Sequence, residues 1–251
     1  MTTKIDWLAG KKELPAHDLF LAALPGVGNV GKLVVDGLAK SPDAKLVARV
    51  LHPDMPPQAL LTDSRLTPPH LALHLLKLNE KTILLLSGEV QPLSPRGQFE
   101  VASELLLQAA KSGCEHVFVL AGLSSEPGVE EVFAICADDA AEEMLSSGGA
   151  TISTDRPEGG VIGLAGLLSS LGPVYGVSSG CIISTSIGNS VDIHSAERMR
   201  LALQNWLNVE LPIPITTTEA IAERIEKLMA EYPDSSLGRE LLEDNSTSLY
   251  A

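Results

Sequence analysis

Residues 19–31, LFLAALPGVGNVG, decide how this chain folds. The first six residues are a continuous apolar run, which is typical of a β-strand covered on both faces by other layers. Residues 25–31 form a glycine-rich turn, and an apolar helical pattern continues from there through Leu38. A strand, a turn and a helix in this order predict the first unit of an α/β domain.

Strand and helix patterns continue to alternate along the chain. The predicted strands are residues 45–51, 59–62, 70–76, 82–86, 116–121, 132–136 and 177–187. The predicted helices follow Ser94–Pro95, cover 138–145 and 163–168, and end the domain at 196–206 and 216–229. Several strands are adjacent, so we expect a mixed sheet in a three-layer α/β sandwich with C-terminal helices. We expect one domain over residues 1–232 and a flexible tail over 233–251.

Composition limits the classes of partner. A chain of 251 residues with 45% hydrophobic content can bury a full core. Its net charge of −14 opposes nucleic acid and anionic membranes as partners. No apolar run approaches the ~18 residues that a membrane helix needs, and the first residues have no apolar signal core. We therefore expect no nucleic-acid or membrane partner and a cytoplasmic location, with Cys114, Cys136 and Cys181 as reduced, buried, structural thiols.

The glycine turn resembles a nucleotide site. Gly26, Gly28 and Gly31 match the G-x-G-x-x-G pattern between a strand and a helix, where backbone can approach a pyrophosphate. A dinucleotide site also needs an acidic residue at the tip of the second strand, but residues 49–52 read Arg-Val-Leu-His there. We therefore favour a turn that packs its helix closely on the sheet, and nucleotide binding remains the alternative.

Two further patterns resemble enzyme motifs. Residues 176–180 match G-x-S-x-G, and Asp192 and His194 follow in hydrolase order. A nucleophile elbow has a strand before the serine and a helix after it, whereas this chain has the reverse order. His70 and His74 alternate with leucines as in a strand, and no Cys or Glu nearby completes a zinc site. We expect no catalytic residue, metal or cofactor, and hence no enzyme.

Five unusual segments occur in a characteristic order. They are residues 25–31, Met55-Pro56-Pro57, Gly122-Leu123, Gly148-Gly149 and the small-residue stretch 160–168. As an ordered set over about residues 18–207, they resemble the proteasome assembly chaperone family of the second type, especially its archaeal members. The resemblance implies a mixed-sheet α/β sandwich similar to nucleoside-phosphorylase-like enzymes, but without their catalytic residues.

The last residues carry a second resemblance. Leu249, Tyr250 and Ala251 end an acidic, hydroxyl-rich stretch that has little apolar surface to bury. They are similar to the hydrophobic-Tyr-any tail of archaeal family members and proteasome activators, which docks between α-subunits of the 20S ring. The resemblance implies that the Ala251 carboxylate meets a basic pocket residue while Tyr250 packs at the rim. We expect a homo-oligomeric assembly chaperone or activator-like protein; the alternative is a nucleotide- or nucleoside-binding enzyme that uses residues 26–31.

Overall fold

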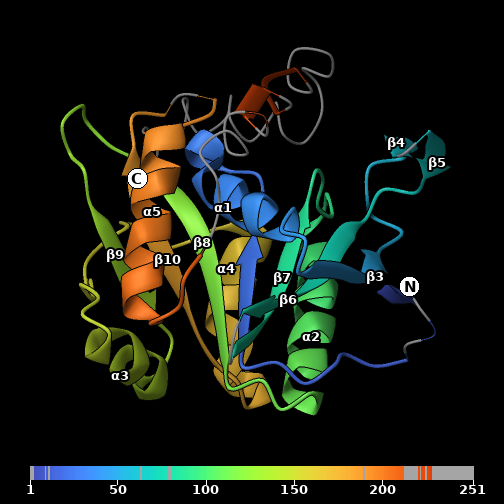
Figure 1. Cartoon of the computed structure of the whole chain (residues 1–251), viewed down its shortest axis with the longest axis horizontal. Coiled ribbons are helices and arrows are strands. Elements are labelled where there is room, and N and C mark those ends of the chain that lie inside the picture. The colour runs from blue at the N-terminus through green and yellow to red at the C-terminus, as the bar shows by residue number, and fades with distance from the viewer. Residues whose placement is uncertain are drawn as a thin grey trace.

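The computed structural model describes residues 3–8, 10, 12–62, 64–78, 81–188, 190–211, 220, 222–223 and 225–227. Within these residues, eight strands form one sheet in the order β1-β3-β6-β7-β2-β8-β10-β9 (Figure 1). The strands are β1 (Lys4–Trp7), β2 (Leu19–Ala23), β3 (Ala44–Leu51), β6 (Leu71–Leu78), β7 (Lys81–Gly88), β8 (His116–Ser124), β9 (Val132–Cys136) and β10 (Ser178–Ser186).

The sheet is mixed, as predicted. Strands β7, β2, β8 and β10 lie parallel at its centre. Every other pairing is antiparallel: β6 with β7, β3 with β6 and β1 with β3 on one side, and β9 with β10 on the other. Every residue of β2 is buried, because Phe20 and Ala22 face one hydrophobic core while Leu19 and Leu21 face a second. This two-sided burial explains why the strand is continuously apolar rather than alternating.

Helices cover both faces of the sheet, which confirms the predicted three-layer sandwich. One layer contains α2 (Pro95–Lys111) and α4 (Gly163–Leu171), which pack side by side over the core that contains Phe20. The other layer contains α1 (Val30–Ala39), α3 (Asp139–Ser147) and α5 (Ile193–Trp206), which cover the core that contains Leu21. Figure 1 shows α1 and α5 on the near side of the sheet and α4 behind it.

Local signals fix where the helices begin. The Ser94 side chain accepts a hydrogen bond from the Gly97 amide, and Pro95 occupies the first turn, as predicted for α2. Asp138 accepts from the Ala141 amide at the start of α3. These caps satisfy amide groups that have no partner within the helix.

Two parts of the fold were not predicted as they occur. Strand β1 at the sheet edge was not predicted, and the predicted strand at 59–62 lies outside the main sheet. It forms β4 (Leu60–Thr62), which pairs with β5 (Arg65–Thr67) in a separate hairpin that stands away from the sheet (Figure 1). Of the predicted helix at 216–229, the described residues 220, 222–223 and 225–227 are helical. The predicted tail at 233–251 lies outside the described residues.

Within the described ranges, each helix is too short or too polar to span a lipid bilayer.

Candidate functional site

The glycine turn between β2 and α1 is a short 3-10 turn, η1 (Val27–Asn29), at the carboxyl end of the central parallel strands. Gly28 has φ +60°, and a Cβ atom there would stand 2.6 Å from the Ser186 hydroxyl oxygen. Asn29 also has a positive φ of 47°, and its side chain donates to the Ser190 carbonyl oxygen at 2.9 Å. Both conformation and space therefore require glycine at position 28.

The turn lies directly against neighbouring backbone. A Cβ atom at Gly31 would overlap the Leu120 carbonyl group of β8, and one at Gly122 would overlap the Val27 carbonyl oxygen. The Asn29 amide donates to the Gly26 carbonyl oxygen, so this N–H is used within the turn. In dinucleotide sites the third glycine makes the same close contact between helix and strand. What differs here is the space beside Gly28, which the side chains of Ser186 and Asp192 occupy. The contact at Gly31 is the close packing that the sequence analysis favoured.

A polar cluster lies next to Gly28 and was not foreseen from the sequence. The Asp192 carboxylate accepts hydrogen bonds from the Ser186 and Ser195 hydroxyl groups at 2.8 and 2.7 Å, and from the Ser195 amide at 2.9 Å. Burial opposes ionisation of Asp192, but these hydrogen bonds and the nearby Arg198 lower its pKa overall. An ionised carboxylate beside the turn disfavours a bound phosphate. The only local signal for the cluster is the D-x-x-S spacing of a helix N-cap.

A buried cation lies at the same edge of the sheet. Lys32 of α1 is 1% exposed, and its ammonium nitrogen is 2.6 Å from an Asp36 carboxylate oxygen and 3.4 Å from one of Glu89. Burial alone would lower the pKa of Lys32, but the two carboxylates raise it. The charged lysine therefore links α1 to the end of β7 through its ion pair with Glu89.

The G-x-S-x-G pattern does not build a catalytic triad. Ser178 begins β10, whereas Asp192 follows the far end of that strand, so roughly 26 Å of extended chain separates the two ends. The Ser179 hydroxyl is buried and donates to the Ser169 carbonyl oxygen at 2.7 Å. His194 is exposed on α5, while Asp192 caps that helix.

The predicted histidine and cysteine environments are confirmed in part. His74 lies in strand β6, as predicted, and burial lowers its pKa. Among the described residues, no group of three or more metal-ligating side chains gathers at one point. All three thiols are free; Cys114 and Cys181 are buried, whereas Cys136 is only half-buried. Burial raises the pKa of Cys114 and Cys181 to about 12 and that of Cys136 to about 11.

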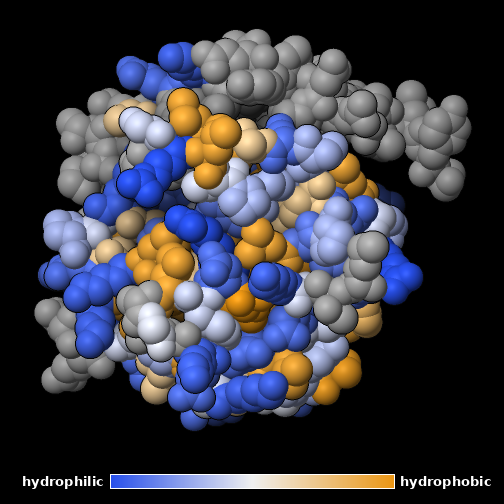
Figure 2. Space-filling model, turned by 90° about the vertical axis from the view of Figure 1, so that its right-hand side faces the viewer, coloured by the Kyte–Doolittle hydropathy of each residue, from blue (hydrophilic) through white to orange (hydrophobic). Residues whose placement is uncertain are grey.

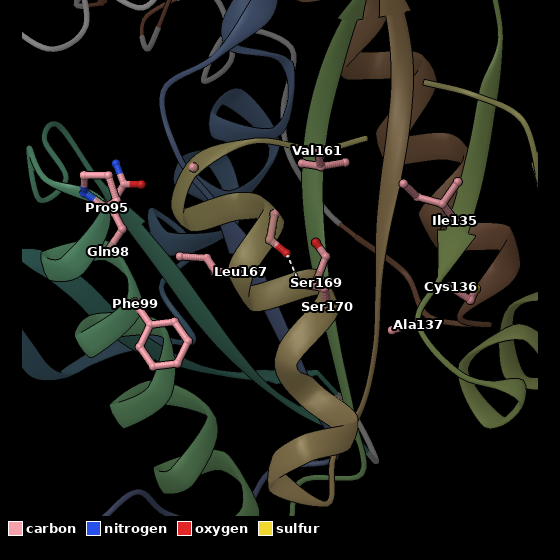
Figure 3. A pocket seen from close by; sticks show the side chains of 12 residues that line it. Pro95, Gln98, Phe99, Ile135, Cys136, Ala137, Val161, Leu167, Ser169 and Ser170 are labelled. Carbon is pink, nitrogen blue, oxygen red and sulfur yellow. Dashed lines mark hydrogen bonds between the residues drawn. The ribbon is translucent and has the colours of Figure 1, made fainter. Parts of the chain in front are cut away.

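A groove of about 650 Å³ opens on the other helical layer. We call it the α2–α4 groove, and its apolar lining is contributed mainly by Phe99, Ile135, Val161 and Leu167. Figure 3 shows Gln98 and Phe99 extending from α2, Leu167 from α4, and Ile135 and Cys136 from the end of β9. Gly166 allows α4 to pack against the backbone of Val161, because a Cβ atom at position 166 would overlap the Val161 carbonyl oxygen.

The proposed tail contacts cannot be placed beside this geometry. Leu249, Tyr250 and Ala251 lie outside the described residues, so their binding role stays a prediction.

The family assignment follows from comparison with known proteins. A model of the PAC2 family matches residues 20–232, and the chain therefore belongs to the PAC2 family. This confirms the resemblance found in the sequence. The chain is also 26% identical, over 196 residues, to an uncharacterized protein of Methanocaldococcus jannaschii, covering 77% of this chain and 75% of that protein.

Two solved structures from Pyrococcus furiosus have the same fold. PbaA, described as an archaeal homolog of proteasome-assembly chaperone, aligns with a TM-score of 0.75 and 23% identity over 97% of this chain and 99% of PbaA. PbaB, described as an archaeal proteasome activator, aligns with a TM-score of 0.75 and 23% identity over 93% of this chain and 99% of PbaB. At such identity the likeness establishes the fold and leaves function to be argued.

Proposed function

We propose that this chain is a proteasome assembly chaperone or activator-like protein that self-associates and binds the α-subunits of the 20S ring. In this proposal the contact residues are Leu249, Tyr250 and Ala251, at the tip of a flexible tail over 233–251 that extends from a single domain over 1–232. The observation that carries the proposal is the PAC2 family match over residues 20–232. The fold shared with PbaA and PbaB supports it.

The polar groups of the domain support a scaffold rather than a catalyst. The Ser186 and Ser195 hydroxyl groups donate to Asp192, which in turn caps α5. The Ser179 hydroxyl donates to backbone. A nucleophile needs a base and an open position for substrate, whereas these hydroxyl groups are used within the fold.

The proposed tail would act through several copies at once. Five acidic residues and Arg239 give the stretch from Glu231 onward a net charge of −4, which suits a basic pocket. Three residues bind weakly because ordering the tail offsets much of their contact energy. About 18 coil residues reach roughly 25 Å, and linked tails experience an effective concentration on the order of millimolar.

The experiment is direct binding of the full chain to immobilised 20S α-subunit rings. Tyr250→Ala should weaken binding at least about tenfold, and one alanine appended after Ala251 should do the same by displacing the carboxylate. Ser246→Ala in the same stretch is the matched control and should bind as the unmodified chain does. Equal binding by all four proteins would reject the tail as the contact.

A further inference from the structure

The β4–β5 hairpin carries two exposed leucines that face each other. We call residues 60–67 the arm. Leu61 and Leu66 are directly opposed across its two strands, and they are 74% and 76% exposed. In Figure 1 the arm stands away from the main sheet, on the side of β3. Single exposed leucines are ordinary on protein surfaces, but a paired set on a projecting element presents one continuous apolar contact.

The arm is short for an element that stands alone. Each of its strands has three residues, and Ser64 in the connection has φ +62°. A two-stranded hairpin is at best marginally stable in water without a further layer against it. A surface that covers Leu61 and Leu66 would supply that layer.

The same chain offers a surface of matching chemistry at a different place. The α2–α4 groove is mostly apolar and has a volume of about 650 Å³. Phe99 on its wall is 48% exposed, and Ile162 at the start of α4 is 80% exposed. Seen from the side where the arm lies, hydrophobic residues reach the surface in separate areas between hydrophilic ones (Figure 2). Because its lining is mostly apolar, the α2–α4 groove is able to bind aliphatic side chains of another molecule.

Charge at the two surfaces is complementary. Cys136 lines one end of the groove; Asp138, two residues further along the chain, caps α3, and Glu142 lies in the first turn of that helix. Two carboxylates are therefore close to that end of the groove. Arg65, next to Leu66 in β5, is exposed and gives the arm a cation. In a chain of net charge −14, such local pairing reduces the repulsion between two copies.

We propose that the arm of one copy inserts Leu61 and Leu66 into the α2–α4 groove of a second copy. Because arm and groove are different surfaces of one molecule, the contact is head-to-tail and repeats from copy to copy until a ring closes. The inference rests on the self-association part of the proposed function and is independent of the tail. An assembly built through this contact would hold the tails of several copies together.

The first test is the assembly state of arm variants, measured by sedimentation velocity over a range of concentrations. Leu61→Asp and Leu66→Asp should each raise the dissociation constant between copies at least about tenfold. Leu201→Asp is the matched control, since Leu201 is 46% exposed on α5 in the other helical layer. It should assemble as the unmodified chain does. Unchanged assembly of both arm variants would overturn the proposal. So would an unmodified chain that stays monomeric at 100 times the lowest concentration of the range.

The second test distinguishes insertion from general surface loss. Phe99→Glu blocks the groove and leaves the arm intact, whereas Leu61→Asp leaves the groove intact. Each variant alone should be monomeric, and an equimolar mixture should form a 1:1 complex through the one remaining arm and groove. If both variants are folded and the mixture stays monomeric, the proposal is overturned. Binding of the assembled chain to α-rings is measured separately, so loss of that binding with intact assembly would reject only the tail.

Discussion

Gly31 of α1 packs directly against the backbone carbonyl group of Leu120 in β8. The contact brings the first turn of α1 down onto the sheet, as the third glycine of a G-x-G-x-x-G turn does in related α/β folds. In this chain Gly28 and Gly31 serve packing, and Asp192, which caps α5, lies beside Gly28. A pattern that is common in nucleotide sites here joins a helix closely to the sheet.

The first prediction concerns this packing. Gly31→Ala should lower the free energy of unfolding by about 3 kcal/mol, because the new methyl group has only rigid backbone to displace. Gly26→Ala is the control within the same turn: Gly26 is extended at φ −173°, and the nearest atom to a Cβ there is 3.9 Å away. It should change stability by less than about 0.5 kcal/mol. Urea unfolding measures both, and equal losses would contradict the packing role.

A second prediction concerns the buried lysine. Lys32→Met should destabilise the protein by about 2–4 kcal/mol at neutral pH, because Asp36 and Glu89 then lose the cation between them. Adding Asp36→Asn should recover part of the loss by removing one of the two charges. Lys45→Met, at an exposed position of β3, should stay within about 0.5 kcal/mol of the unmodified chain. Thermal unfolding of these three variants, of Asp36→Asn alone and of the unmodified chain tests this, and losses that simply add in the double variant would speak against the shared site.

A third prediction concerns acid stability. Glu100 accepts hydrogen bonds from His52 at 3.0 Å and Arg96 at 2.8 Å, which lower its pKa from 4.5 to about 2. The Asp54 amide donates to His52 Nδ1, so Nε2 carries the proton that His52 donates to Glu100. A lowered pKa in the folded state means that this stabilisation is present above pH 4.5 and is lost as pH falls toward 2.

Glu100→Gln tests that linkage. The unmodified chain should exceed the variant in stability at pH 6, and the difference should shrink by pH 3 as the folded state loses its ionised carboxylate. The exposed Glu143 on α3 provides the control, since Glu143→Gln should give a difference of similar size at both values. Urea midpoints at pH 6 and pH 3 measure this, and a gap that widens in acid would refute the sign.

A fourth prediction concerns thiol reactivity. With a pKa of about 11 and partial exposure, Cys136 should react with a thiol reagent at pH 8 about ten times faster than Cys114 or Cys181, whose pKa values are about 12. Mass spectrometry of the labelled protein identifies the order. Cys136→Ser should remove the fast phase, and unfolding should expose the remaining thiols. A fast phase that survives this substitution would contradict the assignment.

Much of the fold could be predicted from local sequence. The apolar run at 19–24 identified a strand buried on both faces, and the Ser94–Pro95 pair located the start of α2. Such segments are predictable because a strand buried on both faces must be apolar throughout, and because a helix N-cap favours a few residue types such as Ser. The order of five weak segments then indicated the family that comparison confirms.

The parts that could not be predicted depend on distant residues. Strand β1 has four residues and exists because it pairs with β3 some forty residues later. The cluster at Asp192 joins the end of β10 to the start of α5, and the α2–α4 groove joins Phe99, Ile135 and Leu167 from three elements. The predicted strand at 59–62 lies in a hairpin, where Leu60 pairs with Thr67 and Leu61 with Leu66 of β5, and it does not join the sheet. No single stretch of sequence carries these relationships.

The most direct test of the proposed function is co-sedimentation with purified 20S α-rings of the full chain and of a chain that lacks Leu249, Tyr250 and Ala251. The full chain should sediment with the rings and the shortened chain should stay in the supernatant, while both keep the same unfolding midpoint and assembly state. Equal sedimentation of the two proteins with the rings would contradict it.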